Sequence, residues 1–257
     1  MLIRKIVNIT STIAGVLMIA AVSFNKLPWW SLLVLAFLWL FITAYGVANI
    51  RSGYFLKSLN NNPKFTEKKI AITFDDGPDP NTLKILEVLN TYNVKGTFFC
   101  IGKQIEKYPD ILLRIIEENH IIGNHTFTHD KLIDIYSTDK FTKEIEDADT
   151  IIEKISGKKP LLFRPPYGIT NPKIARAVKK TGHSVIGWNK RSFDTTIPSE
   201  KVILKRITKN LKGGDVILLH DTKIITVAVL EQLLLFLQSN NFTTVTIDEL
   251  FSIQAYA

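Results

Sequence analysis

The first 66 residues of the chain contain no aspartate and no glutamate. Their charge is therefore entirely positive at +6, whereas the whole chain of 257 residues carries +8. The remaining residues contribute only +2, and no basic patch interleaved with aromatic residues occurs among them. This distribution argues against a nucleic-acid partner, and it assigns the excess positive charge to the N-terminal segment.

Cysteine is nearly absent. Cys100 is the one cysteine of the chain, so no disulfide can form within it. It follows Phe98 and Phe99 in an apolar run, which predicts a buried side chain that packs as a small hydrophobe. Internal repeats and low-complexity stretches are also missing. A hydrophobic content of 46% and a charged content of 22% suit one folded domain with an added apolar segment.

Two long hydrophobic runs lie near the N-terminus. Residues 6–24 and 29–50 can each cross a hydrocarbon core of ~30 Å as a helix at ~1.5 Å per residue. Trp29 begins the second run, where an aromatic belt at a membrane surface would lie. We therefore predict two transmembrane helices. A buried helical hairpin of a soluble protein is an alternative, and for the first run so is a cleaved signal peptide.

Short apolar runs alternate with amphipathic ones from residue 69 onward. Strands are predicted at 69–74, 96–101, 121–122, 161–164, 184–188, 216–220 and 243–247. Helices are predicted at 81–92, 105–118, 138–155, 171–181, 201–211 and 226–240. Such alternation predicts an α/β fold with a parallel sheet, either open or closed into a barrel. We divide the chain into a membrane segment, a polar linker and an α/β domain, at residues 1–57, 58–68 and 69–257.

Polar residues that suit catalysis cluster at the ends of the predicted strands, where parallel α/β folds place active sites. Asp75 and Asp76 leave an apolar strand and meet Gly-Pro, although such pairs are also common in ordinary turns. His125 and His129 are four residues apart and can face one metal if the backbone turns helically. Two histidines and a carboxylate are the usual set for a catalytic zinc or a similar divalent ion.

Three further segments follow predicted strands. Arg164 precedes two prolines that stiffen a loop, and a polar stretch occupies residues 188–195. The last segment is an apolar strand that ends on His220, a residue type that suits a proton donor and whose pKa a nearby carboxylate would raise. His120 and His183 lie in helix-to-strand connections, and we interpret both as surface or packing residues.

Together and in this order, the five segments resemble the polysaccharide deacetylase family of carbohydrate esterases, family four. The resemblance covers about residues 69–250, and it implies a distorted (β/α) barrel with fewer than eight strands. It also implies that three residues bind a metal, namely Asp76, His125 and His129. Five residues are implied in catalysis: the general base Asp75, Arg164 that holds it, the backbone N–H of Tyr167 at the oxyanion, the general acid His220, and Asp194 that orients this acid.

The activity that the resemblance implies is metal-dependent removal of N-acetyl groups from an amino-sugar polymer or oligomer, such as peptidoglycan or a chitin-like chain. Zinc is the expected ion, and cobalt, manganese or nickel suit the same ligands. Thr195 stands where the family often has a tryptophan that lines the acetyl pocket, so the pocket's shape stays open. Alternatives are an O-acetyl esterase acting on a polysaccharide such as xylan, and a non-catalytic carbohydrate-binding membrane protein.

The membrane topology is the point on which the sequence gives two conflicting indications. Because residues 25–28 form a tight connector, two spans would place both ends of the hairpin on one side. The residues before the first run and after the second run carry more basic side chains than the connector between the runs. The positive-inside rule then favours a cytoplasmic catalytic domain. The polymers on which the family acts lie outside the cytoplasm, and on that ground we predict a cell-membrane protein with an extracytoplasmic catalytic domain.

Overall fold

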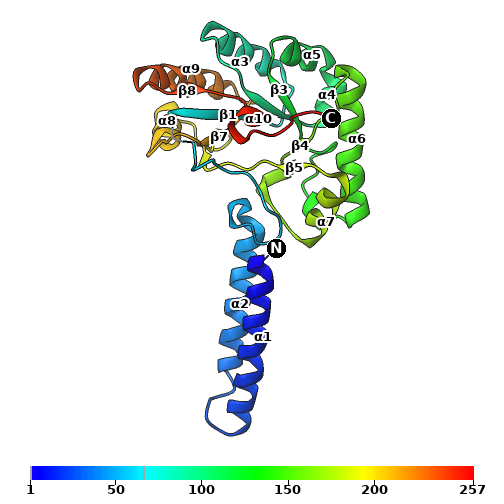
Figure 1. The fold of residues 1–257 in the computed structure, drawn as a ribbon, viewed down its shortest axis with the longest axis vertical. Coiled ribbons are helices and arrows are strands. Elements are labelled where there is room, and N and C mark those ends of the chain that lie inside the picture. Colours follow the sequence, from blue (N-terminus) through cyan, green and yellow to red (C-terminus); the bar gives the residue numbers. More distant parts are fainter. Residues whose placement is uncertain (1, 66) are drawn as a thin grey trace.

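The computed structural model describes residues 2–65 and 67–257 of the chain. A helical hairpin and an α/β domain make up the molecule (Figure 1). The hairpin consists of α1 (Leu2–Ser23) and α2 (Ser31–Ala48). Its loop points away from the α/β domain, whereas the start of α1 and the end of α2 lie next to it (Figure 1).

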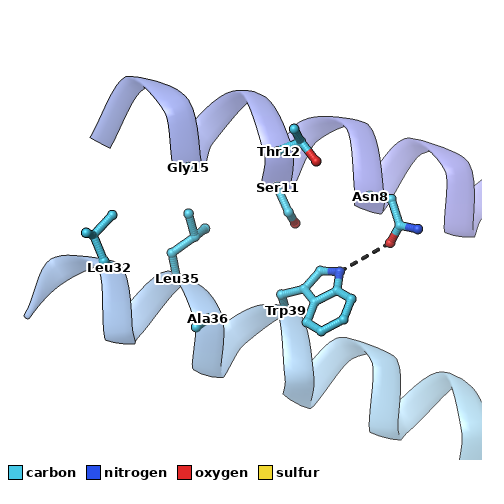
Figure 2. Close-up of a pocket in the computed structure, with 8 residues that line it drawn as sticks. All are labelled: Asn8, Ser11, Thr12, Gly15, Leu32, Leu35, Ala36 and Trp39. Carbon is cyan, nitrogen blue, oxygen red and sulfur yellow. Dashed lines mark hydrogen bonds between the residues drawn. The ribbon is translucent and has the colours of Figure 1, made fainter. Parts of the chain in front are cut away.

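The hairpin presents an apolar surface. By length and composition, Ile3–Ser23 and Ser31–Ala48 are candidate membrane spans. Leu17 and Phe37 are 65% and 67% exposed, so the alternative of a hairpin buried within this chain does not hold. In the groove between the helices, the indole N–H of Trp39 donates a hydrogen bond to Oδ1 of Asn8 at 3.2 Å (Figure 2). Such a bond satisfies polar groups at membrane depth.

A curled parallel sheet forms the centre of the α/β domain, with the strand path β5-β4-β3-β2-β1-β7-β6. The strands are β1 (Lys69–Asp75), β2 (Thr97–Cys100), β3 (Ile121–Asn124), β4 (Leu162–Phe163), β5 (Ser184–Val185), β6 (Lys190–Arg191) and β7 (Val216–His220). A two-residue strand, β8 (Thr243–Thr244), pairs with the start of β1 off this path. Among the described residues the path ends at β5 and β6, so the barrel is open, and its path has fewer than eight strands, as the resemblance implied.

Helices pack around this sheet and account for most of the predicted helical segments. They are α3 (Pro80–Thr91), α4 (Gly102–Lys107), α5 (Pro109–Glu117), α6 (Thr138–Ser156), α7 (Pro172–Thr181), α8 (Glu200–Thr208), α9 (Ile224–Ser239) and α10 (Ile247–Phe251). The single helix predicted at 105–118 is wrong. Pro109 begins α5 instead, because a proline lacks the N–H that a continuing helix would need. The strands predicted at 184–188 and 243–247 end early, at Val185 and Thr244.

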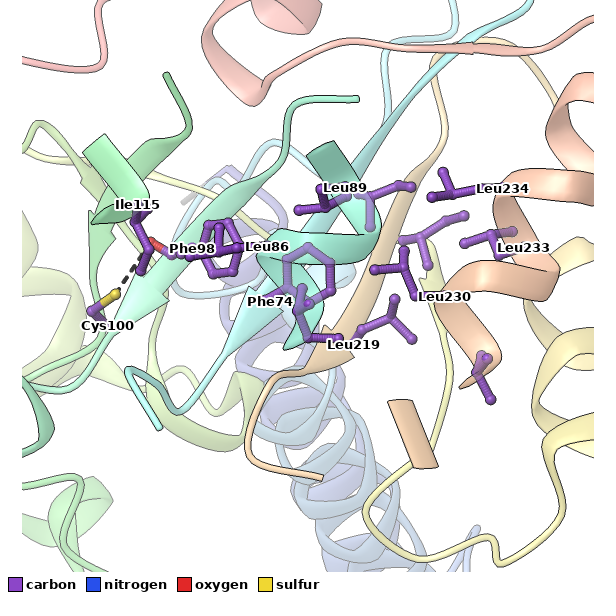
Figure 3. Packing of buried hydrophobic residues seen from close by; sticks show 14 of the residues in the cluster. Phe74, Leu86, Leu89, Phe98, Cys100, Ile115, Leu219, Leu230, Leu233 and Leu234 are labelled. Carbon is purple, nitrogen blue, oxygen red and sulfur yellow. Dashed lines mark hydrogen bonds between the residues drawn. The ribbon is translucent and has the colours of Figure 1, made fainter. Parts of the chain in front are cut away.

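The main core lies between the sheet and helices α3, α5 and α9. The rings of Phe74 and Phe98 stack with centroids 4.8 Å apart, and leucines of α3 and α9 pack beside them (Figure 3). Cys100 is fully buried in this cluster, as predicted. Six of the seven residues of β1 are buried, because both faces of a central parallel strand are covered.

The segment between the hairpin and β1 packs closely on the domain. Ile50, Tyr54 and Phe55 are buried, at most 5% exposed. Leu59 forms a β-bridge with Ile186, and further on the amide of Asn62 donates to the carbonyl of Leu250. The stretch interpreted as a polar linker is therefore anchored on the domain at its first residues.

Candidate active site

Strand register brings the predicted site residues together at the carboxyl edge of the sheet. Asp75 at the end of β1 pairs with His220 at the end of β7. Asn124 pairs with Phe163 across β3 and β4, so the residues that follow them, His125 and Arg164, leave the sheet side by side. All eight residues predicted for the site lie in this region and connect through the contacts described below.

Asp76, His125 and His129 converge on one point. Each offers a ligand atom, and these atoms lie within 4.8 Å of one another. The Nε2 atoms of both histidines are 3.5 Å from Oδ1 of Asp76. Nδ1 of His125 lies 2.7 Å from the carbonyl of Arg164 and donates to it, because a carbonyl only accepts. That bond leaves the Nε2 lone pair of His125 for a metal, so the donor set fits a divalent ion.

The electrostatic environment of these three residues also suits metal binding. Burial lowers the pKa of His129 to about 4, and the charge of His125 adds to this effect. Burial alone would raise the pKa of Asp76, but its hydrogen bond and charge interactions with His125 hold that pKa well below its ordinary value. A neutral imidazole and an ionised carboxylate are the forms that ligate a metal.

The two histidines face one point although the backbone between them makes no helical turn. Residues 125–130 form an irregular loop, in which Thr126 and His129 adopt left-handed φ values of 66° and 49°. Asp76 is also left-handed, at 78°. Such conformations are costly for residues other than glycine, and they cluster at functional sites. Glu144 of α6 accepts hydrogen bonds from the backbone and the hydroxyl of Thr128, and these bonds hold the loop.

Asp75 lies beside the metal ligands and is held by Arg164. Nη1 of Arg164 is 2.6 Å from Oδ1 of Asp75, and both side chains are buried. The free carboxylate oxygen, Oδ2, lies 3.9 Å from Nε2 of His125. This oxygen therefore faces the point on which the ligands converge.

His220 and Asp194 form a second charged pair on the other side of Asp75. Nδ1 of His220 is 2.7 Å from Oδ1 of Asp194, and the backbone N–H of His220 donates to Oδ2. Ser192 and Thr226 donate further hydrogen bonds to this carboxylate. Burial alone would lower the pKa of His220, but the hydrogen bond and charge of Asp194 raise it above its ordinary value. A protonated imidazole at this position can donate a proton.

Tyr167 lies in the loop after β4, with a left-handed φ of 60°. Its backbone N–H donates no hydrogen bond within the described residues, and its ring lies 4.8 Å from that of His129. The same loop is attached to the hairpin. The N–H of Thr170 donates to the carbonyl of Val47 at 3.0 Å, and its hydroxyl donates to that of Gly46 at 3.2 Å.

Neither Thr195 nor Trp188 takes the place of the tryptophan that the resemblance puts after Asp194. Thr195 is exposed at this position. Trp188 is buried below the loop of Tyr167. The Cζ of Arg164 lies 5.5 Å from its ring centroid, and a Cβ on Gly168 would meet the ring at 2.6 Å. Trp188 therefore supports Arg164 and this loop from behind.

Asp221 is a buried acid that the sequence analysis did not assign a role. It is 1% exposed, and Oδ2 accepts a hydrogen bond from Thr82 at 2.7 Å. A Cβ on Gly77 would lie 2.1 Å from Oδ2, so the turn after Asp76 requires glycine. Burial raises the pKa of Asp221 to about 7, and the charge of Asp76 adds to it. The one available signal was its position directly after His220.

His120 and His183 are packing residues. His120 accepts a hydrogen bond from the backbone N–H of Gly96, and His183 bonds to Thr181 and Asp149. Both are buried, at 3% and 8% exposure. Neither belongs to the site.

An open parallel barrel with an Asp-His-His cluster, a buried carboxylate and a paired histidine at its strand ends defines a hydrolase-like site of the carbohydrate esterase kind. The pattern that describes the polysaccharide deacetylase family matches residues 62–186. A peptidoglycan-N-acetylglucosamine deacetylase of Bacillus cereus is 37% identical over 209 residues, which cover 77% of this chain and 93% of that protein. The chain belongs to the polysaccharide deacetylase family.

Other relatives support the same assignment. The peptidoglycan-N-acetylmuramic acid deacetylase PdaC of Bacillus subtilis is 35% identical over 185 residues; the match covers 72% of this chain but 39% of that longer protein. Among solved structures, a peptidoglycan N-acetylglucosamine deacetylase bound to an N-hydroxybenzamide compound superposes with a TM-score of 0.73 at 30% identity. That match covers 77% of this chain and 94% of that one.

The fold alone does not guarantee activity within this family. A protein of Bacillus anthracis described as a pseudoenzyme shares the fold with a TM-score of 0.67 at 24% identity. The side chains at the strand ends therefore carry the functional argument for this chain.

Proposed function

We propose that this protein is a membrane-anchored, metal-dependent deacetylase that removes N-acetyl groups from peptidoglycan or a similar amino-sugar polymer. Residues 1–57 form its membrane segment, residues 58–68 link this segment to the catalytic domain, and residues 69–257 form that domain. In this proposal the catalytic domain lies outside the cytoplasm, because the relatives are named for activity on the cell-wall polymer. The apolar surface of α1 and α2 supports the membrane anchor.

One observation supports the reaction most strongly. Asp75 and His220 are paired across adjacent strands and flank the point where Asp76, His125 and His129 converge. Amide hydrolysis needs a base for the attacking water, stabilisation of the oxyanion and an acid for the leaving nitrogen. Residues suited to each task meet here.

Asp76, His125 and His129 would hold the divalent ion, with zinc as the expected metal. A bound ion of this kind lowers the pKa of a water molecule and polarises the acetyl carbonyl. Asp75, held by Arg164, accepts the proton of the attacking water through Oδ2. The backbone N–H of Tyr167 donates a hydrogen bond to the developing oxyanion. Nε2 of His220, kept protonated by Asp194, gives its proton to the departing amine.

The presence of a general acid, His220, supports an N-acetyl substrate over an O-acetyl ester. A departing amine needs protonation, whereas an alkoxide leaves more easily, and the chain supplies a buried Asp-His pair for this step. The relatives named above are also N-acetyl deacetylases.

The test is acetate release by the full-length protein in detergent, with peptidoglycan fragments, chitooligosaccharide and acetylxylan as substrates. A chelator should abolish release, and Zn²⁺ added afterwards should restore it. Release of acetate from acetylxylan alone would contradict the N-deacetylase assignment. Release of acetate by a protein from which the chelator has removed all metal would contradict metal dependence.

A further inference from the structure

A group of basic side chains lies where the end of α2 meets the domain, next to the loop of Tyr167. Arg51, Arg191 and Arg206 line one pocket of about 350 Å³ together with the rings of Trp188 and Phe193. Among the described residues no acidic side chain lines it. The three arginines come from separate segments of the chain, so no basic run in the sequence reveals the group.

Arg191 and Arg206 both lie close to the ring of Phe193. The Cζ atoms lie 4.5 Å and 4.4 Å from the centroid of Phe193, and Nε of Arg206 donates to the carbonyl of Arg191 at 2.9 Å. Within the described part of the chain, neither these two arginines nor Arg51 forms an ion pair. Two guanidinium groups that share one platform repel each other, and an anion between them would offset this repulsion.

The active-site carboxylates do not neutralise this group. Asp75 and Asp194 attract Arg191, but Asp75 is paired with Arg164 and Asp194 with His220. A neighbouring pocket of about 460 Å³ shares Arg191 and Arg206 and adds Lys205 and Lys209. The basic surface therefore continues from the hairpin toward α8. Guanidinium groups recognise phosphate through paired N–H donors, so phosphate is the anion that this arrangement suits.

The position of the pocket indicates which kind of molecule would carry the phosphate. Tyr45 and Ala48 in the last turn of α2, and Asn49 at its C-terminal cap, form part of the wall. With α2 in a membrane, this wall lies at the level of the lipid headgroups. We propose that the pocket binds the phosphodiester headgroup of an anionic phospholipid. This inference rests on the membrane anchoring in the proposed function.

The same proposal gives a second explanation for Arg51, one of the basic residues that count in the topology argument. Positive charge at the domain end of the hairpin favours the cytoplasmic side when it is counted only as a topology signal. A basic surface built to hold an anionic headgroup accounts for part of this charge on either side of the membrane, because anionic lipids attract juxtamembrane arginines and lysines.

The experiment uses the full-length protein in nanodiscs made from equal parts of phosphatidylcholine and phosphatidylglycerol. Lipids that remain bound after mild detergent extraction are counted by native mass spectrometry. The wild type should retain phosphatidylglycerol in preference to phosphatidylcholine. That preference should fall about fivefold in R51Q and about 25-fold in R191Q/R206Q, since each basic residue near an anionic surface contributes about a factor of five. K84Q on α3, remote from the hairpin (Figure 1), is the matched control and should behave as wild type.

Three results would overturn the lipid site. The first is an unchanged preference in R51Q and in a folded R191Q/R206Q. The second is equal displacement of the lipid by inorganic phosphate at the same concentration, which identifies a site for the free ion. The third is a raised KM for soluble peptidoglycan fragments with lipid retention intact, which identifies a subsite for an anionic glycan. Failure of the anchoring is seen separately, as recovery of the wild type in the soluble fraction after lysis.

Discussion

Arg164 and Asp75 form a fully buried ion pair, with Nη1 2.6 Å from Oδ1. The remaining donors of Arg164 bind Thr73 and the carbonyls of Ile186 and Gly187, so the guanidinium joins the strand of the base to the segment after β5. One side chain thus holds Asp75, the general base of the proposed mechanism, and also bonds to the segment after β5. If that mechanism is right, catalysis and folding are coupled at this pair.

Replacing Arg164 should therefore destabilise the whole domain. Arg164→Met leaves the Asp75 carboxylate buried without a partner, and removing one member of a buried pair typically costs about 3–5 kcal/mol. Urea denaturation followed by circular dichroism measures the change in free energy of unfolding. Lys143→Met, which breaks the exposed pair with Asp147, is the control and should change stability little. Equal small effects in both variants would show that the Arg164 pair is not a structural element.

The two adjacent carboxylates should separate by role. Asp76→Ala should purify largely free of metal, because it removes one of three ligands. Asp75→Asn should keep its metal and its fold but lose turnover by about 10²–10⁴, the usual value for a general base. Elemental analysis and acetate release on the same preparations measure both properties. Loss of metal in Asp75→Asn, or full activity in Asp76→Ala, would reverse or refute the assignment.

His220 should act on the leaving group and depend on Asp194. His220→Ala should lower kcat on the amide while metal content stays constant, and an activated ester should suffer much less. The Asp194 carboxylate raises the pKa of His220, so the acid stays protonated to higher pH. Asp194→Asn should therefore move the upper pH limit of kcat to lower pH. An unshifted alkaline limb in this variant would argue against the pair as the acid.

Asp221 should make the stability of the protein fall toward neutral pH. Its folded pKa is raised from 3.8 to about 7, so the folded state holds a proton that the unfolded state releases. The corresponding stability is complete below about pH 4 and is lost as the pH rises through about 7. Asp221→Asn keeps an acceptor for Thr82 and stays neutral, so its advantage over wild type should grow across this interval. Urea denaturation midpoints at several pH values measure this difference in stability. If the midpoints of the two proteins changed with pH in parallel, the raised pKa of Asp221 would be contradicted.

Thr170 should position the loop of Tyr167 through the hairpin. Thr170→Val removes the hydroxyl bond to Gly46 at nearly constant volume. We expect kcat to fall about tenfold at constant KM, less than the ~10²–10³ that loss of an oxyanion donor costs. Thr170→Ser should restore most of the rate. A change in KM alone, or no recovery with serine, would speak against positioning.

The sequence predicted the parts of the site that sit at strand ends. Asp75 and His220 were identifiable because a polar residue that interrupts an apolar strand stands out in the chain, and strand register then places such residues at one edge. The break at Pro109 was also visible in the residue type, although we predicted a continuous helix there.

What the sequence could not give are arrangements that depend on distant segments. The loop that carries the left-handed residues Thr126 and His129 is held from α6, where Glu144 accepts hydrogen bonds from Thr128. Arg51 joins Arg191 and Arg206 in one pocket only because the chain at the end of α2 folds back against the domain. The burial of Asp221 follows from its packing against Thr82 of α3. None of these leaves a pattern in the chain itself.

The docking of α2 on the loop of Tyr167 also limits how far the enzyme can reach. Between the end of α2 and the first β-bridge at Leu59 the chain is buried or bonded at several points, so it supplies no slack. With the hairpin in a membrane, the catalytic centre would stay at one height above the bilayer. If the substrate is peptidoglycan, as proposed, glycan strands in the layer nearest the membrane would be deacetylated and strands farther out would be spared.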